Sequence, residues 1–222
     1  MDKTLGVIFD MDGVLVDSEY AMREAGIRAL RRYGVEASHE DFYEFTGMGE
    51  DSFIGGVARK HGLEYTLAIK ELAYEIYVDE CLELVILPPA VPDMLKALRV
   101  AGMFRLAVAS SSDRVKVSAN LKRIGVDDGF FDAVVTGSDI TRKKPFPDIF
   151  LKAAGLIGVK PSRCIVLEDA LSGLQAAKDA GMSRIGVCSF FDAETLSEKK
   201  PDYIISDMSE AYGKILEWAD GR

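Results

Sequence analysis

Two aspartates close to the N-terminus have the types and spacing that phosphoryl-transfer chemistry needs. Residues 5–9, Leu-Gly-Val-Ile-Phe, are apolar without polar alternation, as in a strand buried on both faces of a sheet. Asp10 and Asp12 follow this run at once, and Gly13 lets the chain turn away. A carboxylate at a strand end can attack phosphorus and form an aspartyl phosphate. The alternative is that both aspartates only form the turn, where Asp is common.

Further polar groups follow later strand-like runs of the chain. They are Ser110 with Ser111, then Lys144, then Glu168 with Asp169. In an open α/β sheet, ligands bind beyond the carboxyl ends of the parallel strands. We therefore expect these groups to converge with Asp10 and Asp12 at one edge of a sheet.

The residue types predict a division of roles in such a site. Asp10 is expected to be the nucleophile, and Asp12 the general acid and base that protonates the leaving group and then deprotonates water. The adjacent acids Glu168 and Asp169 suit a hard cation with oxygen ligands, which favours Mg²⁺. Several carboxylates this close repel one another, so Lys144 is expected to neutralise both the phosphoryl group and Asp10.

Ser110, Ser111 and the backbone N–H groups that open the following helix are expected to bind phosphate oxygens. Each residue also has an ordinary structural explanation. Ser110 can cap that helix, Lys144 can be a solvated loop lysine like Lys143, and the Glu-Asp pair can cap the helix after it. These explanations are independent of one another. Their coincidence in this order therefore favours the catalytic interpretation.

The elements that must position these residues alternate between strand and helix. After residue 88 this alternation predicts an α/β fold, a Rossmann-like parallel sheet with helices on both faces. Residues 18–87 show only helical spacing, including one helix over residues 66–82. We therefore predict a catalytic core domain, residues 1–17 and 88–222, with an inserted all-helical cap domain over residues 18–87.

The composition excludes several classes of partner. The chain has 27 Lys and Arg residues against 36 Asp and Glu residues, a net charge of −9, which argues against nucleic acid. Three cysteines without CxxC spacing suggest neither a zinc site nor a disulfide framework. The sequence shows neither a signal peptide nor an apolar run of membrane-spanning length. We expect a cytoplasmic protein, or a stromal one after removal of a transit peptide, with a monomer as the default.

Four motifs of the chain resemble those of the haloacid dehalogenase (HAD) superfamily. They are Asp10-Met11-Asp12-Gly13-Val14-Leu15, Val108-Ala109-Ser110, Lys144-Pro145-Phe146-Pro147-Asp148 and Glu168-Asp169. The run from Glu168 through Gly173 to Met182 resembles the β-phosphoglucomutase-like phosphatases in particular. The resemblance covers nearly the whole chain, including the helical cap. The segment from Thr46 to Ala58 also bears a faint resemblance to the phosphatase-like domain of a large plant thylakoid protein.

The resemblance implies a particular sheet, metal site and activity. The Asp10 strand should be central, flanked by the strands that end at Ser110 and Glu168. Mg²⁺ should be held by the side chains of Asp10 and Asp169 and by the backbone carbonyl of Asp12, with Glu168 either a ligand or in contact with one. The implied activity is a Mg²⁺-dependent phosphatase that acts on a small phosphorylated metabolite, a sugar phosphate or similar, which the cap selects.

The chain departs from the mutases of this family in the predicted cap. Met22 stands where the mutases carry a histidine, and Glu50 and Asp51 stand where they carry basic residues that grip a second phosphate. We therefore favour a hydrolase over the alternative, a hexose-phosphate mutase. Met22, Gly47, Met48 and Glu50 are the candidate specificity residues of the cap.

Other functions are less consistent with the residues. A dehalogenase would leave Asp12 without a role. A phospho-aspartate signalling receiver is shorter, and its paired acids and phosphorylated aspartate lie on separate strands. A binding module without turnover would lack one of the core groups, and none is missing from this sequence.

Overall fold

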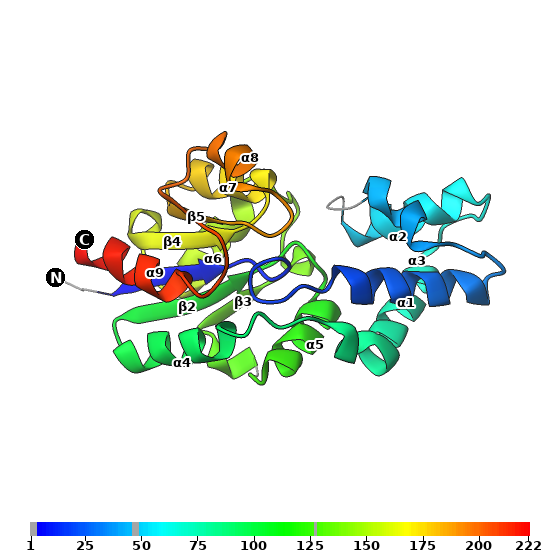
Figure 1. Cartoon of the computed structure of the whole chain (residues 1–222), viewed down its shortest axis with the longest axis horizontal. Helices are drawn as coiled ribbons and strands as arrows, with labels where there is room; N and C mark the ends of the chain where they lie inside the picture. Colours follow the sequence, from blue (N-terminus) through cyan, green and yellow to red (C-terminus); the bar gives the residue numbers. More distant parts are fainter. Residues whose placement is uncertain (1–3, 46–48, 127) are drawn as a thin grey trace.

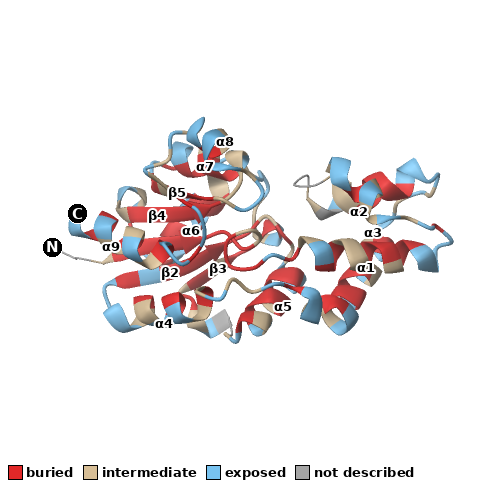
Figure 2. Ribbon diagram, in the orientation of Figure 1, coloured by how far each residue is buried: buried red, intermediate tan, exposed pale blue. Residues whose placement is uncertain are grey.

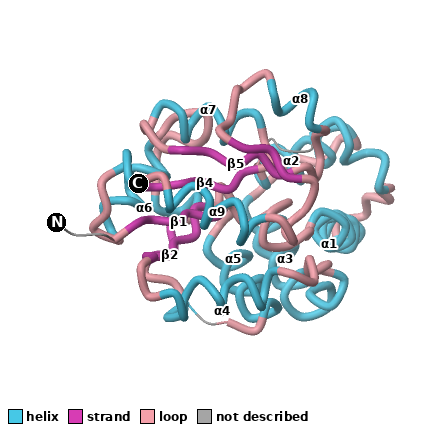
Figure 3. Tube along the Cα trace, turned by 60° about the vertical axis from the view of Figure 1, so that its left-hand side comes forward, coloured by secondary structure: helices cyan, strands magenta, loops and turns pink. Residues whose placement is uncertain are grey.

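The computed structural model describes residues 4–45, 49–126 and 128–222. Within them, strands form one parallel sheet in the order β3-β2-β1-β4-β5-β6. Figure 3 shows β2, β1, β4 and β5 of this sheet among the helices. The strands are β1 (Leu5–Phe9), β2 (Phe104–Ala109), β3 (Ala133–Val135), β4 (Cys164–Glu168), β5 (Ser183–Val187) and β6 (Tyr203–Ile205). The predicted Rossmann-like α/β class is confirmed, and β1 lies at the centre of the sheet between β2 and β4.

The sheet is apolar on both faces, as the unbroken apolar run of β1 predicts. Val7 and Phe9 belong to one hydrophobic cluster, whereas Ile8 between them belongs to a second. Such alternation is the period of a strand. Helices α4, α5 and α9 contribute to the first cluster, and α6 and α7 to the second. Figure 2 shows the buried strands between these outer layers. The core helices are α4 (Val91–Ala101), α5 (Arg114–Ile124), α6 (Asp148–Leu156), α7 (Leu171–Asp179), α8 (Ala193–Ser197) and α9 (Ala211–Asp220).

The segment between β1 and α4 is helical and lies at one end of the molecule (Figure 1). Its elements are α1 (Glu19–Arg32), η1 (His39–Phe45), α2 (Glu50–Lys60), α3 (Leu67–Ile76), η2 (Tyr77–Cys81) and η3 (Leu82–Leu84). Helix α1 packs against α3 and η2, and α2 packs against η1. Phe42, Ile54 and Ile69 of this segment belong to the same hydrophobic cluster as Val7 of the sheet.

The single helix predicted over residues 66–82 is wrong in one respect, because the structure divides it. Helix α3 ends at Ile76 and continues as a π-helical turn, Tyr77–Cys81. The hydroxyl of Tyr77 donates to Oδ1 of Asn120 on α5, 2.5 Å away. π-Helical turns often lie at functional sites. A contact across 43 residues of chain is not visible in local apolar spacing.

The two segments that connect the helical region to the sheet lie side by side. Asp17 and Ile86 form an antiparallel bridge in which each backbone N–H donates to the other carbonyl at 2.9 Å. Asp12 and Val16 form a second bridge just before it. Within the described residues, no helix combines the length and apolarity of a membrane span.

Candidate active site

The carboxyl edge of the sheet brings the predicted site residues together. Phe9 pairs with Val108 on one side and with Leu167 on the other, so Asp10, Ser110 and Glu168 lie at the ends of three adjacent strands. A cavity of about 740 Å³ opens over this edge, toward the helical segment. Lys144 and Asp169 also line it.

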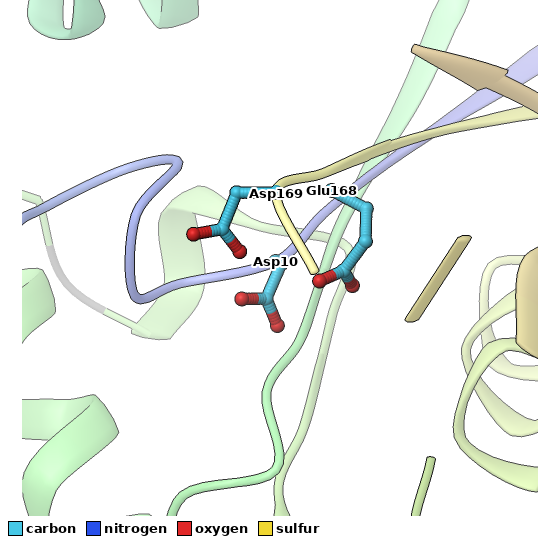
Figure 4. A group of neighbouring side chains, drawn as sticks. All are labelled: Asp10, Glu168 and Asp169. Atoms are coloured by element: carbon cyan, nitrogen blue, oxygen red, sulfur yellow. The ribbon is translucent and has the colours of Figure 1, made fainter. Parts of the chain in front are cut away.

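Three acids, which we call the acidic floor, line this cavity, and Figure 4 shows their side chains close together. Asp10, Glu168 and Asp169 each offer a carboxylate oxygen, and these oxygens lie within 4.8 Å of one another. Nζ of Lys144 lies 2.5 Å from Oδ1 of Asp10 and 2.7 Å from Oε2 of Glu168. The Lys144 side chain is only 7% exposed. One buried ammonium therefore faces three carboxylates.

The excess of negative charge appears in the pKa values. Burial, together with the charges of Glu168 and Asp12, raises the pKa of Asp10 above its ordinary value, although Lys144 opposes the shift. Burial and the nearby Asp10 raise the pKa of Asp169 to about 7. Burial acts to lower the pKa of Lys144, but the carboxylates of Asp10 and Glu168 outweigh burial and raise it. The cluster thus lacks positive charge.

This cluster fits a magnesium ion. All three side chains offer oxygen, the ligand that Mg²⁺ prefers in proteins. A divalent cation would also offset the charge that Lys144 leaves uncompensated, which is costly to keep in a buried site. Asp10, Glu168 and Asp169 are therefore the side chains that could hold it. The backbone carbonyl of Asp12 stays a prediction as a further ligand.

Magnesium is expected to stabilise the protein more at about pH 7.5 than at about pH 5. Without metal, the folded protein binds a proton at Asp169 more tightly than the unfolded chain does, because the pKa of this residue is raised from 3.8 to about 7. The free energy of unfolding of the metal-free protein therefore falls as the pH rises from about 5 to about 7.5. At pH 5 Mg²⁺ must displace the proton on Asp169, so its binding adds less stability there. Melting temperatures with and without Mg²⁺ at both pH values test this. An equal shift at both, or an undiminished shift in Asp169→Asn, would contradict it.

Two glycines make room for the acids. Gly13 has φ +77°, and a Cβ there would lie 1.9 Å from Oδ2 of Asp169. A Cβ at Gly173 would lie 2.0 Å from the carboxyl carbon of Glu168. Neither approach is possible for a real side chain. The two glycines therefore let helix α7 and the loop after β1 close directly on the acidic floor.

Asp12 lies at the same edge but points to a different set of partners. Its carboxylate accepts from the hydroxyl of Ser18, from Oγ of Ser112 at 3.0 Å, and lies 3.1 Å from Nζ of Lys116. Burial raises the pKa of Asp12, but Lys116 and the two hydroxyl groups outweigh it and hold that pKa below its ordinary value. Asp12 is therefore ionised in this arrangement.

Sequence reasoning missed these three partners of Asp12. Ser18 begins α1 without a side-chain capping bond, because its hydroxyl serves Asp12 instead. Lys116 lies in the first turn of α5 and its side chain is only 8% exposed. One feature of the sequence could have indicated two of these partners: Ser112 and Lys116 are four residues apart and follow shortly after Ser110.

Replacing Lys116 with Met is expected to lower the free energy of unfolding by about 2–4 kcal/mol, since removing one partner of a buried ion pair leaves the other charge uncompensated. Urea unfolding at neutral pH measures this. The control is Lys122→Met, because Lys122 lies on the same helix but is exposed. Losses of equal size in the two variants would show that the Lys116–Asp12 pair has no special weight.

The predicted phosphate-binding serines line the cavity. Ser110 is 1% exposed, and its Oγ accepts the backbone N–H of Ser112 at 3.2 Å. Ser111 is half-buried and lines the cavity. The helix-capping explanations for Ser110 and the Glu-Asp pair do not hold, because the N-cap residues of α5 and α7 are Asp113 and Ala170. Glu168 accepts the backbone N–H of Ala170 at 3.1 Å, but this bond precedes the helix and does not cap it. Lys143 is exposed, as expected for a solvated loop lysine.

The candidate cap residues are only partly placed. Met22 is 3% exposed and lines the cavity. Gly47, Met48 and the side chain of Glu50 lie outside the described residues.

Asp51 is the other acid of the helical segment predicted to oppose a second phosphate. It binds Tyr65 at 2.8 Å and Lys70 at 3.0 Å instead. It is also absent from the described cavity lining. Asp51 therefore does not oppose a second phosphate in this arrangement.

Comparisons with known proteins agree with this geometry. The model of the family "haloacid dehalogenase-like hydrolase" matches residues 4–181. Protein SUPPRESSOR OF QUENCHING 1, chloroplastic, of Arabidopsis thaliana is 41% identical over 211 residues, which are 93% of this chain but only 20% of that protein. The phosphorylated carbohydrates phosphatase of Thermotoga maritima is 30% identical over 215 residues, 92% of this chain and 98% of that relative.

A solved structure shares the same architecture. CbbY from Rhodobacter sphaeroides, in complex with phosphate, matches with a TM-score of 0.81 and 26% identity. The match covers 93% of this chain and 96% of that one. The resemblance drawn from the four motifs is thereby confirmed.

Proposed function

The chain belongs to the haloacid dehalogenase-like hydrolases and is a phosphoric monoester hydrolase, and from this premise we propose that it is a Mg²⁺-dependent phosphatase of small phosphorylated metabolites such as sugar phosphates. The observation that carries the proposal is the position of Lys144 between Asp10 and Glu168, with Asp169 beside them. A nucleophile, a cation and a metal-binding set of oxygens thus share one cavity. The relative from Thermotoga maritima supports the substrate class.

The proposed reaction has two displacements at phosphorus. A carboxylate oxygen of Asp10 attacks phosphorus as the bond from phosphorus to the ester oxygen breaks. The ester oxygen keeps the electron pair of that bond and takes a proton from the protonated form of Asp12. Water then attacks the aspartyl phosphate, and Asp12 takes its proton as Asp10 and inorganic phosphate separate. Lys144, Ser110 and Ser111 would hold the charge of the phosphoryl oxygens. When bound, Mg²⁺ supplies the positive charge that lets an anionic ester approach Asp10.

Asp12 must turn for this chemistry. In the structure its carboxylate is bound to Lys116, Ser18 and Ser112. Donating a proton to the leaving group requires the ionised carboxylate to leave these partners, to take up a proton from water once Lys116 no longer holds its pKa down, and to face the cavity. Since Ser18 lies at the start of the helical segment, movement of that segment is a natural means of releasing Asp12.

We assign residues 18–87 to a cap that covers the site. The cavity is lined by Met22, Gly49 and Phe53 from this segment as well as by the sheet edge. The paired crossings at Asp17 and Ile86 are a suitable hinge. In this proposal the core performs the reaction and the cap selects the leaving group.

The proposed setting of the enzyme follows from its relatives and its charge. The relative from Arabidopsis thaliana is described as chloroplastic, so the proposal covers an organelle stroma as well as the cytoplasm. The partner is a small phosphorylated substrate rather than nucleic acid or a membrane. A monomer stays a prediction.

Release of phosphate from p-nitrophenyl phosphate tests the function. We expect turnover that is abolished by a chelator and restored by Mg²⁺. Screening a panel of phosphorylated metabolites then identifies the substrate. Turnover that is unaffected by the chelator would contradict the metal-dependent mechanism, and no turnover of any ester would contradict the phosphatase.

We further expect hydrolysis to outpace mutase activity by a wide margin. Met22 can neither carry charge nor donate a hydrogen bond, so the aspartyl phosphate is poorly protected from water. With β-glucose 1-phosphate and a trace of glucose 1,6-bisphosphate, free phosphate should form faster than glucose 6-phosphate. Glucose 6-phosphate forming much faster than phosphate would show that the enzyme is a mutase.

A further inference from the structure

Apolar side chains form one part of the cavity wall, beside polar and charged ones. A phosphoryl group fills only a small part of 740 Å³, so the remainder must hold the leaving group. The walls include Met22 and Phe53 from the helical segment, Leu171 from α7, and Phe190 and Phe191 from the loop after β5. None of these side chains can donate a hydrogen bond to a substrate.

The aromatic pair is fixed directly beside the acidic floor. Oγ of Ser189 donates to Oδ2 of Asp169 at 2.5 Å and accepts the backbone N–H of Phe190 at 2.6 Å. The rings of Phe190 and Phe191 pack edge to face, with centroids 4.9 Å apart and an interplanar angle of 88°. One residue therefore links a candidate metal ligand to the aromatic wall.

Phe190 is nevertheless 62% exposed. Leaving a phenyl ring in water forgoes the free energy that its burial would give, and a side chain of this kind at a cavity wall is typical of a binding site. Its exposed area can be covered by the flat face of a ring. Two aromatic rings favour offset-stacked or edge-to-face contacts with each other.

The charges in the cavity select against a second anion. Among the described lining residues, seven are acidic and two, Lys116 and Lys144, are basic. Both ammonium groups lie within 3.1 Å of carboxylates. Even with a divalent cation on the floor, negative charge stays in excess. A carboxylate or second phosphate on the leaving group would therefore be repelled.

We infer that the alcohol released by this enzyme carries a ring that packs on Phe190 and no second anionic group. This inference rests on the proposed phosphatase function and narrows its substrate class. It favours monophosphate esters of sugars, carbocycles or aromatic alcohols. It disfavours bisphosphates and phosphorylated acids.

Three synthetic esters separate the two requirements: ethyl phosphate, benzyl phosphate and 4-carboxybenzyl phosphate. All three release primary alcohols, so their intrinsic reactivity is similar. We expect kcat/KM for benzyl phosphate to exceed that for ethyl phosphate by at least about tenfold, the scale of apolar contacts in a pocket. It should exceed that for 4-carboxybenzyl phosphate by a similar factor.

Substitutions at Phe190 test its part in this selectivity. In Phe190→Ala the ratio of benzyl to ethyl phosphate should fall toward one, and Phe190→Tyr should retain it. The control is Leu156→Ala, because Leu156 is similarly exposed, 60%, but is absent from the described cavity lining. A ratio that survives in Phe190→Ala, or an equal loss in Leu156→Ala, would overturn the role of Phe190.

The outcomes distinguish this inference from the proposed function. Hydrolysis of all three esters with benzyl phosphate no better than ethyl or 4-carboxybenzyl phosphate would overturn only the inference. Hydrolysis of none of them would overturn the phosphatase function as well.

Discussion

Replacing Asp10 with Asn is expected to lower kcat by about four orders of magnitude or more, the scale that follows loss of a covalent nucleophile. The amide has the shape of the carboxylate but lacks the anion that attacks phosphorus. The substitution keeps the residue at the end of the central strand, where Oδ1 of Asp10 lies 2.5 Å from Nζ of Lys144 in the unsubstituted protein. Phosphate release from p-nitrophenyl phosphate with saturating Mg²⁺ measures the loss.

The stability of the same variant is its control. Burial and the charge of Glu168 raise the pKa of Asp10, so its ionised form is disfavoured in the metal-free fold. Asp10→Asn removes that charge and should leave the metal-free protein at least as stable as wild type near neutral pH. A folded variant that retains near-wild-type turnover would exclude Asp10 as the nucleophile.

Replacing Lys144 with Met is expected to lower both activity and stability. The substitution leaves Asp10 and Glu168 buried without the ammonium that lies 2.5 and 2.7 Å from them. Removing one member of such a buried group costs about 3–5 kcal/mol of unfolding free energy. Loss of a preorganised charge at the phosphoryl group should lower kcat by about 10²–10³-fold.

The neighbouring lysine provides a matched control for this variant. Lys143 is exposed, so Lys143→Met should change neither quantity by much. The stability deficit of Lys144→Met should also shrink as the pH falls from about 7 to about 5, because protonation relieves carboxylates whose pKa is raised. A deficit that is independent of pH, or equal effects of the two variants, would contradict the assigned role of Lys144.

The centre of the fold could be predicted from the sequence because a parallel strand buried on both faces must be apolar throughout. The run from Leu5 to Phe9 meets that requirement, and Asp10 ends it. Strand alternation then implies that Ser110 and Glu168 share its edge of the sheet. The pairing of Phe9 with Val108 and Leu167 confirms this.

The surroundings of Asp12 could not be predicted in the same way. Lys116 and Lys122 lie on one helix and look alike in sequence, yet one is buried and the other exposed. The difference arises from a carboxylate that is about a hundred residues earlier in the chain, at Asp12. Local spacing carries no information on such a contact.

The aromatic wall was missed for a related reason. Two phenylalanines after a strand resemble ordinary core residues, and apolar side chains are common inside proteins. The bond from Ser189 to Asp169 and the position of Phe190 in the cavity wall place this ring at the site, and local spacing shows neither. The residues of the helical segment that face the cavity could not be predicted either. Apolar spacing predicts helices there, but it does not show which side chains face the cavity.

The most direct test of the mechanism is to trap the phosphate on Asp10. The Asp12→Asn variant should form the phosphoenzyme from p-nitrophenyl phosphate, whose leaving group needs little protonation, but should lose it slowly to water. After an acid quench, trypsin releases residues 4–23 as one peptide, and borohydride reduction converts an aspartyl phosphate to homoserine. We predict homoserine at position 10 in this peptide. Homoserine at another position, or an unmodified peptide from an enzyme that is releasing p-nitrophenol, would contradict catalysis through Asp10.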